Sequence, residues 1–230
     1  MNAEMLAARV AEVREGIERA MQRAGRTGDV TLVAVTKTHP PEIVQAAIAA
    51  GLADVGENRV QEMEDKVAAV GRSAVRWHLI GHLQRNKAGK AVELADLVHS
   101  LDSLRLAEAL SKEAQRAGTT VDALVQVNTS GEESKFGLAA DEAVDAVGRM
   151  AELPGLRLAG MMTMAPFTDD QAVIRRTFAA ARRLCDEAAR QVPAIGRQLS
   201  MGMSNDYEIA VEEGSTLVRV GSTLFGERGR

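Results

Sequence analysis

The sequence has few aromatic residues, a single cysteine and no excess of positive charge. Aromatic residues make up 3% of the 230 positions, so leucine, valine, isoleucine, methionine and alanine must fill the core. Cys185 is the only cysteine, which excludes an intramolecular disulfide and favours a reducing compartment. The formal net charge is −4. This net charge does not indicate nucleic acid or an anionic membrane as a partner.

Long hydrophobic runs are also missing. No segment approaches the ~18 apolar residues that a membrane span needs. The N-terminal stretch MNAEMLAARVAEVREG is interrupted by Glu4, Arg9 and Glu12 and lacks the apolar segment of a signal peptide. We therefore expect a soluble, cytoplasmic protein that makes no use of a membrane.

Short apolar segments alternate with helical stretches along the chain. Eight candidate strands lie at Leu32–Val35, Ala53–Val55, Val75–Ile80, Leu97–His99, Val121–Val127, Leu156–Met162, Gln198–Met201 and Leu217–Val220. The helical stretches between them begin near Pro41, Arg59, Gln84, Ser103, Asp141, Asp169 and Ser204. Such alternation predicts a parallel sheet. Eight repeats predict an α/β fold of the closed (β/α)8, TIM-type barrel class.

An extra helix is expected at the N-terminus, where apolar residues recur at helical spacing over residues 3–24. Only Leu224 to Arg230 follow the last candidate strand, which is too short for a regular eighth helix. The N-terminal helix is therefore expected to cover the barrel beside that strand. No linker or low-complexity segment interrupts the pattern, so residues 1–230 predict one domain. Without an obvious dimerisation element, we expect a monomer.

Lys37 follows the first candidate strand in the stretch LVAVTKTHP. In barrels of this kind the working groups lie where strands run into the following loops. A lysine there is either a solvated side chain whose stem covers apolar surface or a reactive amine. Only six of the 28 basic residues are lysines, so a lysine at this position favours chemistry that arginine cannot perform. A partly desolvated amine can form a Schiff base with an aldehyde.

Glycine and hydroxyl residues follow the last two candidate strands, in SMGMSND (Ser200 to Asp206) and RVGSTLFG (Arg219 to Gly226). Gly202 and Gly221 would let backbone N–H groups approach an anion. Ser204 is expected to cap the next helix, where backbone amides and the helix dipole favour phosphate. Two ordinary turns would have a similar composition. However, the loops after strands seven and eight are the recurrent phosphate site of this fold.

A phosphorylated aldehyde would fit between these two features, since strands one, seven and eight are neighbours in a closed barrel. Pyridoxal 5′-phosphate (PLP) is such a molecule. The segments LVAVTKTHP, VGENRVQE, WHLIGHLQRNK, SKFGL, GMMTM and LSMGMSNDYEIAVEEGSTLVRVGSTLFG cover most of the chain in order. Through them the sequence resembles the pyridoxal phosphate homeostasis proteins, which are single-domain relatives of the alanine racemase barrel and belong to fold-type III of the PLP-binding proteins.

The resemblance implies a set of cofactor-binding residues. Lys37 would carry the cofactor, and phosphate contacts would lie near Ser204, Gly221 and Thr223. Arg219 would face the pyridine nitrogen. The resemblance also implies that the protein holds PLP and delivers it, with PLP-dependent apo-enzymes as partners, and that no firm catalytic activity is attached to this role.

Physical reasoning supports a protein that is not an enzyme. An arginine opposite the pyridine nitrogen disfavours protonation of that nitrogen, which makes PLP a weaker electron sink. The only tyrosine, Tyr207, is expected beside the phosphate end and not at a second catalytic position. Two alternatives stay open. One is a PLP-dependent amino-acid racemase or decarboxylase of the same barrel type, and the other is a barrel enzyme that joins Lys37 to a sugar phosphate without a cofactor.

Several weaker signals remain undecided. Asn58 either places an amide near the phenolic oxygen of PLP or is a polar turn residue. His78 and His82 have HxxxH spacing but share no helix, so we expect no metal site. The roles of His82 and Lys135 cannot be assigned from the sequence. Cys185 lies on an apolar helical stripe and is expected in the core.

Overall fold

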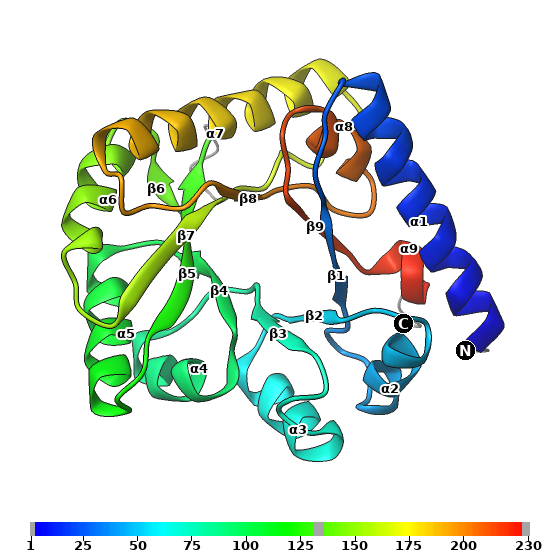
Figure 1. The fold of residues 1–230 in the computed structure, drawn as a ribbon, viewed down its shortest axis with the longest axis horizontal. Helices are drawn as coiled ribbons and strands as arrows, with labels where there is room; N and C mark the ends of the chain where they lie inside the picture. The colour runs from blue at the N-terminus through cyan, green and yellow to red at the C-terminus, as the bar shows by residue number, and fades with distance from the viewer. Residues whose placement is uncertain (1–2, 131–135, 227–230) are drawn as a thin grey trace.

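Eight parallel strands form a closed barrel at the centre of the molecule, and helices surround it (Figure 1). This computed structural model describes residues 3–130 and 136–226. Around the ring, the strands are β1 (Thr31–Val35), β2 (Asp54–Glu57), β3 (Arg76–Leu79), β4 (Leu97–Leu101), β5 (Val121–Asn128), β7 (Leu156–Met162), β8 (Gln198–Ser200) and β9 (Leu217–Val220). Each pairs with the next, and β9 pairs with β1 to close the ring. The predicted TIM-type barrel is confirmed.

Helices follow most of the strands, as expected for this fold. They are α1 (Ala3–Arg23), α2 (Glu42–Ala49), α3 (Val60–Val70), α4 (Ala88–Leu94), α5 (Leu104–Arg116), α6 (Ala143–Ala151), α7 (Gln171–Gln191), α8 (Tyr207–Glu212) and α9 (Ser222–Phe225), with a 3₁₀ helix, η1 (Arg85–Lys87), before α4. Local capping explains two of the boundaries. The side chain of Ser103 accepts a hydrogen bond from the amide of Leu106, and Asp170 accepts from the first amides of α7, which satisfies N–H groups that a helix start leaves unpaired.

The strands alternate between the barrel interior and the helical layer. Along β1, Leu32 and Ala34 pack with α1 on the outside, whereas Val33 packs in the interior with residues of other strands. This is the two-residue period of a strand. The next inward-facing residue is Val35, which is the last residue of β1. Lys37 follows at the same end of the barrel.

The N-terminal helix takes the place of a full eighth helix. The apolar face of α1, formed by Leu6, Val10, Val13, Ile17 and Ala20, packs on side chains of β1 and β9 and on Leu224 and Phe225 of the short α9. Figure 1 shows α1 running along this side of the barrel. The expected cover beside the last strand is therefore confirmed.

Two local features differ from the sequence prediction. Among the described residues a short extra strand, β6 (Leu138–Ala139), pairs with the end of β5, and two residues are too few to show a periodic pattern. The helix expected to start at Ser204 begins at Tyr207, so Ser204 is not its cap.

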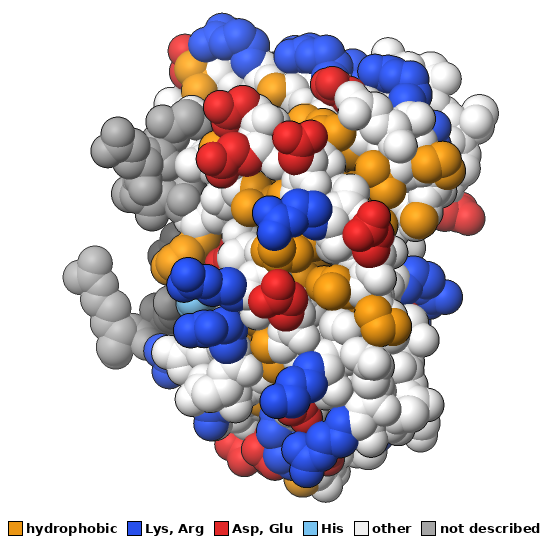
Figure 2. Space-filling model, turned by 90° about the vertical axis from the view of Figure 1, so that its left-hand side faces the viewer, with side chains coloured by type: hydrophobic (Ala, Val, Ile, Leu, Met, Phe, Trp, Pro, Cys, Tyr) orange, Lys and Arg blue, Asp and Glu red, His pale blue; other side chains and the backbone are white. Residues whose placement is uncertain are grey.

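The outer surface mixes charge with small apolar areas. On the flank seen in Figure 2, Lys and Arg side chains lie beside Asp and Glu side chains, with hydrophobic side chains scattered between them. In the described parts of the chain, no helix combines the length and the apolar character that crossing a bilayer requires. Cys185 is buried in the outer core, as expected.

Candidate functional site

A cavity of about 1150 Å³ lies at the carboxyl ends of the barrel strands. Five of the six residues expected to bind a cofactor line it, namely Lys37, Asn58, Ser204, Arg219 and Gly221. The sixth, Thr223, reaches the same region through its backbone, as described below. Side chains that the sequence places at strand ends, where a barrel carries its functional groups, therefore meet at one cavity.

Lys37 enters the cavity from a tight turn that directly follows β1. The amide of His39 donates to the carbonyl of Thr36 at 3.1 Å, which closes the turn around Lys37 and Thr38. Lys37 is half-buried and lines the cavity. Its amine is thus held at a mouth that is partly shielded from water, which suits a nucleophile.

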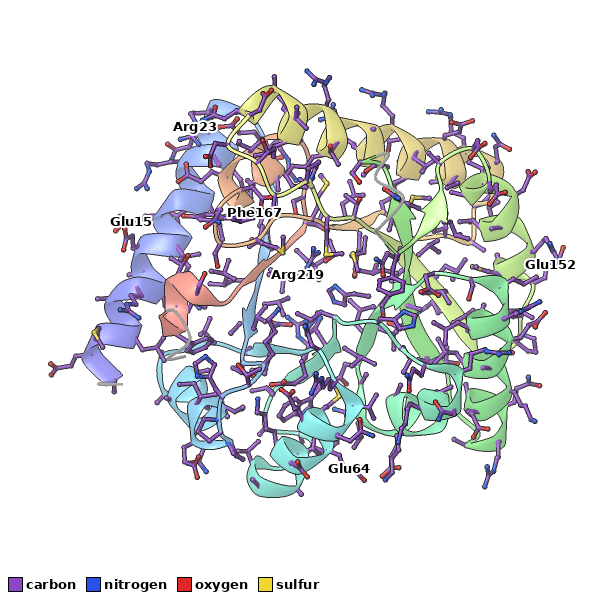
Figure 3. All side chains as sticks on the ribbon, turned by 180° about the vertical axis from the view of Figure 1, so that it is seen from behind. Glu15, Arg23, Glu64, Glu152, Phe167 and Arg219 are labelled. Atoms are coloured by element: carbon purple, nitrogen blue, oxygen red, sulfur yellow. The ribbon has the colours of Figure 1, made fainter. Side chains whose placement is uncertain are left out.

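Arg219 places a buried cation against the cavity. It stands in β9 and is 4% exposed, and Figure 3 shows it near the middle of the ring of strands. Its Nη2 donates to the carbonyl of Thr163 at 3.1 Å and its Nη1 to the hydroxyl of Ser200. Burial lowers the pKa of Arg219 to about 10, although the charge of Asp206 opposes this. Both hydrogen-bond acceptors are neutral oxygens, and a guanidinium carries five N–H donors, so donors remain for a ligand.

A chain of buried polar groups runs from Arg219 through the barrel interior. The hydroxyl of Ser200 lies 2.8 Å from Nδ1 of His99, and Nε2 of His99 lies 2.9 Å from Nδ1 of His78. Nε2 of His78 in turn lies 2.9 Å from the carboxylate of Asp54. Burial lowers the pKa of His99 well below its usual 6.5, and the nearby charges of His78 and Arg219 lower it further.

When His99 is neutral, one arrangement of protons satisfies every group in this chain. Arg219 can only donate, so the oxygen of Ser200 accepts from it and the hydroxyl proton goes to Nδ1 of His99. Nε2 of His99 then carries the proton that it donates to His78, and His78 donates to the carboxylate of Asp54. Each donor therefore has an acceptor. From the sequence, His78 was considered only as a possible metal ligand. The chain was missed because its five members lie on five different strands.

Ser204 organises the backbone at the other side of the cavity. Its hydroxyl oxygen accepts hydrogen bonds from the amides of Gly221 and Thr223, at 3.3 Å and 3.5 Å. It does so from the loop after β8, so it links this loop to the loop after β9. The expected pairing of the two loops is present, although Ser204 acts across the loops and does not cap α8.

Two glycines allow these loops to pack closely. A Cβ at Gly221 would lie 3.2 Å from the carbonyl oxygen of Val35. Gly202 has a φ of +94°, and a Cβ there would lie 2.5 Å from the Cβ of Ala210. A side chain at Gly202 would therefore clash, and its backbone also lies in the region that favours glycine.

Two polar residues near the site point away from the cavity. Tyr207 packs on α1, because a Cβ at Gly16 would lie 2.3 Å from its hydroxyl, and burial raises the pKa of Tyr207. Glu57 faces the helical layer, where its carboxylate pairs with Lys66 at 2.6 Å. Burial raises the pKa of Glu57 even though Lys66 opposes the shift. As expected, Tyr207 begins the helix that follows the loop of Ser204, and its side chain is directed to α1.

The mouth of the cavity carries aromatic side chains and a histidine. His82 stacks on Phe136, with ring centroids 4.3 Å apart, and its Nδ1 lies 3.1 Å from Asp102. Phe167 also lines the cavity and is 96% exposed. Lys135 lies outside the described residues. Within residues 3–130 and 136–226, no group of three His, Cys, Asp or Glu side chains is arranged to hold a metal ion.

Comparison with known proteins assigns the class and then the family. Residues 9–229 match the family described as alanine racemase, N-terminal domain. Alanine racemase of Clostridium difficile has the same fold, with a TM-score of 0.73 at 13% identity over 94% of this chain and 60% of that one. The chain is thus a barrel of the alanine racemase type.

More similar relatives narrow this assignment. The pyridoxal phosphate homeostasis protein of Aquifex aeolicus is 39% identical over 221 residues, which is 96% of this chain and 97% of the relative. The structure of PipY from Synechococcus elongatus with PLP bound has a TM-score of 0.85 at 37% identity, covering 96% of this chain and all of that one. The chain belongs to the pyridoxal phosphate homeostasis protein family, as the sequence segments indicated.

Proposed function

We propose that this protein binds pyridoxal 5′-phosphate through a Schiff base with Lys37 and acts in intracellular vitamin B6 homeostasis by holding and releasing the cofactor. The observation that carries this proposal is that the amine of Lys37, the guanidinium of Arg219 and the loops joined by Ser204 meet in one cavity. PipY, a relative of nearly equal length, has been solved with PLP bound.

The groups around the cavity match the chemistry of the cofactor. The amine of Lys37 suits the aldehyde, which supplies reversible imine chemistry when it is bound. The hydroxyl of Ser204 suits the phosphate, since its oxygen accepts from the amides of Gly221 and Thr223 while its O–H group is still able to donate to an oxygen anion. Arg219 suits the pyridine nitrogen, to which a guanidinium N–H can donate while it keeps its own charge. The amide of Asn58 is left to orient the ring edge that carries the phenolic oxygen.

The same residues disfavour amino-acid catalysis. Arg219 as the partner of the ring nitrogen weakens the cofactor as an electron sink. Tyr207 packs against Gly16 of α1 and therefore cannot serve as an acid or base at the cavity. We accordingly propose that the protein is a carrier and not an enzyme. A PLP-dependent amino-acid racemase or decarboxylase is the second candidate function.

We extend the proposal to the setting in which the protein acts. The barrel and its α1 cover account for the described chain as one domain, and we propose that residues 1–230 act as a monomer. The single, buried Cys185 suits a reducing cytoplasm. PLP-dependent apo-enzymes are the proposed recipients of the cofactor.

The absorbance spectrum of the purified protein tests this function. A visible band that borohydride abolishes is expected, because reduction removes the imine. A protein that stays colourless after incubation with PLP would contradict the proposal and would favour an enzyme that acts on sugar phosphates.

A further inference from the structure

The turn that carries Lys37 contains a strained residue. Among the described residues, Thr38 is the only one other than glycine with a positive φ, 65°. A β-branched residue rarely adopts this conformation. Thr38 holds the third position of the turn from Thr36 to His39, where turns with a positive φ usually have glycine or asparagine. The strain therefore lies directly beside the residue that bears the amine.

Two charged side chains of α3 hold this turn. The amide of Thr38 donates to the carboxylate of Glu62 at 2.8 Å. The ammonium of Lys66 donates to the carbonyl oxygen of Thr36 at 2.7 Å. Glu62 and Lys66 are four residues apart and so lie on the same face of the helix. Their opposite charges match the donor and the acceptor that each one meets.

The two contacts fix both peptide groups that flank Lys37. The carbonyl of Thr36 belongs to the peptide before Lys37, and the amide of Thr38 belongs to the peptide after it. The orientation of these two planes sets φ and ψ of Lys37, and thereby the direction of its Cα–Cβ bond. A hydrogen bond to a charged group is stronger than one between neutral groups, so each plane has a firm anchor on α3.

The ammonium of Lys66 is itself held in place by a buried carboxylate. It is 2% exposed and lies 2.6 Å from the carboxylate of Glu57, which is fully buried. Glu57 also accepts a hydrogen bond from the hydroxyl of Thr36. Buried ion pairs seldom stabilise a fold more than apolar side chains of similar size would. This pair instead places a cation at the one carbonyl that precedes Lys37.

We propose that Glu62 and Lys66 are positioning residues for Lys37, which hold its strained turn so that the amine is directed into the cavity and at the aldehyde of the cofactor. The inference rests on the proposed function. It adds that α3, which never touches the cavity through these two side chains, controls how fast Lys37 reacts.

Variants of Glu62 test this inference, since this residue lies outside the cavity lining. In protein stripped of cofactor, the rate of imine formation with PLP is followed by absorbance for the parent, Glu62→Ala and Glu62→Gln. The Kd of pyridoxine 5′-phosphate is measured in parallel. That analogue carries an alcohol where PLP has its aldehyde, so it reports binding without reaction. Glu64→Ala is the matched control, because Glu64 lies on the same helix (Figure 3) and pairs with Lys90 at 2.8 Å.

Glu62→Ala is expected to slow imine formation roughly tenfold or more, since misplacing a reacting group by 1 Å can cost about a hundredfold. The Kd of the analogue should not change. Glu62→Gln should keep most of the rate, because its amide oxygen can still accept from Thr38, and Glu64→Ala should react like the parent. The double variant Glu57→Gln, Lys66→Met removes both buried charges together and should also slow the reaction.

Equal rates in the parent and Glu62→Ala would overturn the inference. So would a rate and a Kd that worsen together, because that result describes a damaged site and not a misdirected amine. A parent protein that forms no imine at all would instead refute the proposed function. The absorbance measurement on the parent protein is enough to reveal that outcome.

Discussion

His78 and His99 face each other inside the barrel, with Nδ1 of one ring 2.9 Å from Nε2 of the other. One ring must donate and the other accept, so the two facing nitrogens carry one proton between them. The chain continues through Ser200 to Arg219. Burial lowers the pKa of His99 and the charge of Arg219 lowers it further, so the neutral state of His99 is tied in part to the buried cation at the cavity.

The first prediction concerns stability below neutral pH. The pKa of His99 in the fold lies well below 6.5, whereas the unfolded chain takes up this proton near that value. The contribution is therefore fully present above pH 6.5 and is lost as the pH falls from there toward the lower, folded pKa. Acidification from pH 7 to pH 5 should therefore lower the unfolding free energy of the protein.

Urea unfolding of His99→Gln at both pH values checks this. The amide of glutamine can accept from Ser200 and donate to His78 but does not titrate, so the variant should lose less stability on acidification than the parent. His82→Gln, at the cavity mouth, serves as the control and should behave like the parent. The pKa of Asp54 is lowered from a usual value of about 4. Asp54 therefore does not change its charge between pH 7 and pH 5. An unchanged pH dependence in His99→Gln would show that the ring is not held neutral.

The second prediction concerns the phosphate. Ser204→Ala together with Thr223→Ala should weaken the retention of PLP, since a hydrogen bond to a charged acceptor contributes about 1.5 to 3 kcal/mol. The loss of Ser204 also removes the acceptor that aligns the amides of Gly221 and Thr223. Pyridoxal, which has no phosphate, should bind the parent poorly and should be insensitive to the two substitutions. Equal affinity of the parent for both vitamers would argue against a phosphate site at these loops.

The third prediction concerns the fit of the loop after β8. Gly202→Ala should destabilise the protein by more than about 2 kcal/mol, because it adds a clash with Ala210 to the cost of a positive φ, which is roughly 1 kcal/mol. Gly118→Ala is the matched control, since Gly118 has a φ of +64° with no atom within 4 Å of the added Cβ. The loss of stability in Gly118→Ala should be limited to the roughly 1 kcal/mol that a positive φ costs. Equal unfolding free energies for the two variants would mean that the loop yields to the added methyl group.

The fourth prediction is the absence of amino-acid turnover. Holo-protein assayed against a panel of L- and D-amino acids should show negligible racemase, transaminase or decarboxylase activity, given Arg219 as the proposed partner of the ring nitrogen and the position of Tyr207. Turnover of ~1 s⁻¹ or faster that disappears in Lys37→Ala would reverse this conclusion and support the racemase-type alternative.

The barrel and most of the site follow from local sequence patterns. Alternating apolar and helical segments gave the order of the elements, and the strand-end rule picked out Lys37 and Asn58, whereas the role expected of Arg219 came from the resemblance to a known family. The order of the elements and the position of these side chains at strand ends could be predicted because period, turn residues and strand ends are properties of neighbouring residues.

The rest depends on contacts between distant segments. Ser204 bonds to amides 17 and 19 residues away, so its sequence neighbourhood suggested a helix cap. His99 stands in an otherwise apolar strand, and only the closed barrel brings it to His78 and Ser200. Glu62 and Lys66 have the composition of an ordinary charged helix, and no local pattern shows that they face the turn around Lys37.

The central claim is that Lys37 carries the cofactor, and mass mapping of the borohydride-reduced protein tests it most directly. After reduction in the presence of PLP and proteolysis, the pyridoxyl adduct should lie on the peptide that contains Lys37, and Lys37→Ala should lose it. An adduct found mainly on Lys135 or on another lysine, or one that persists in Lys37→Ala, would contradict the account.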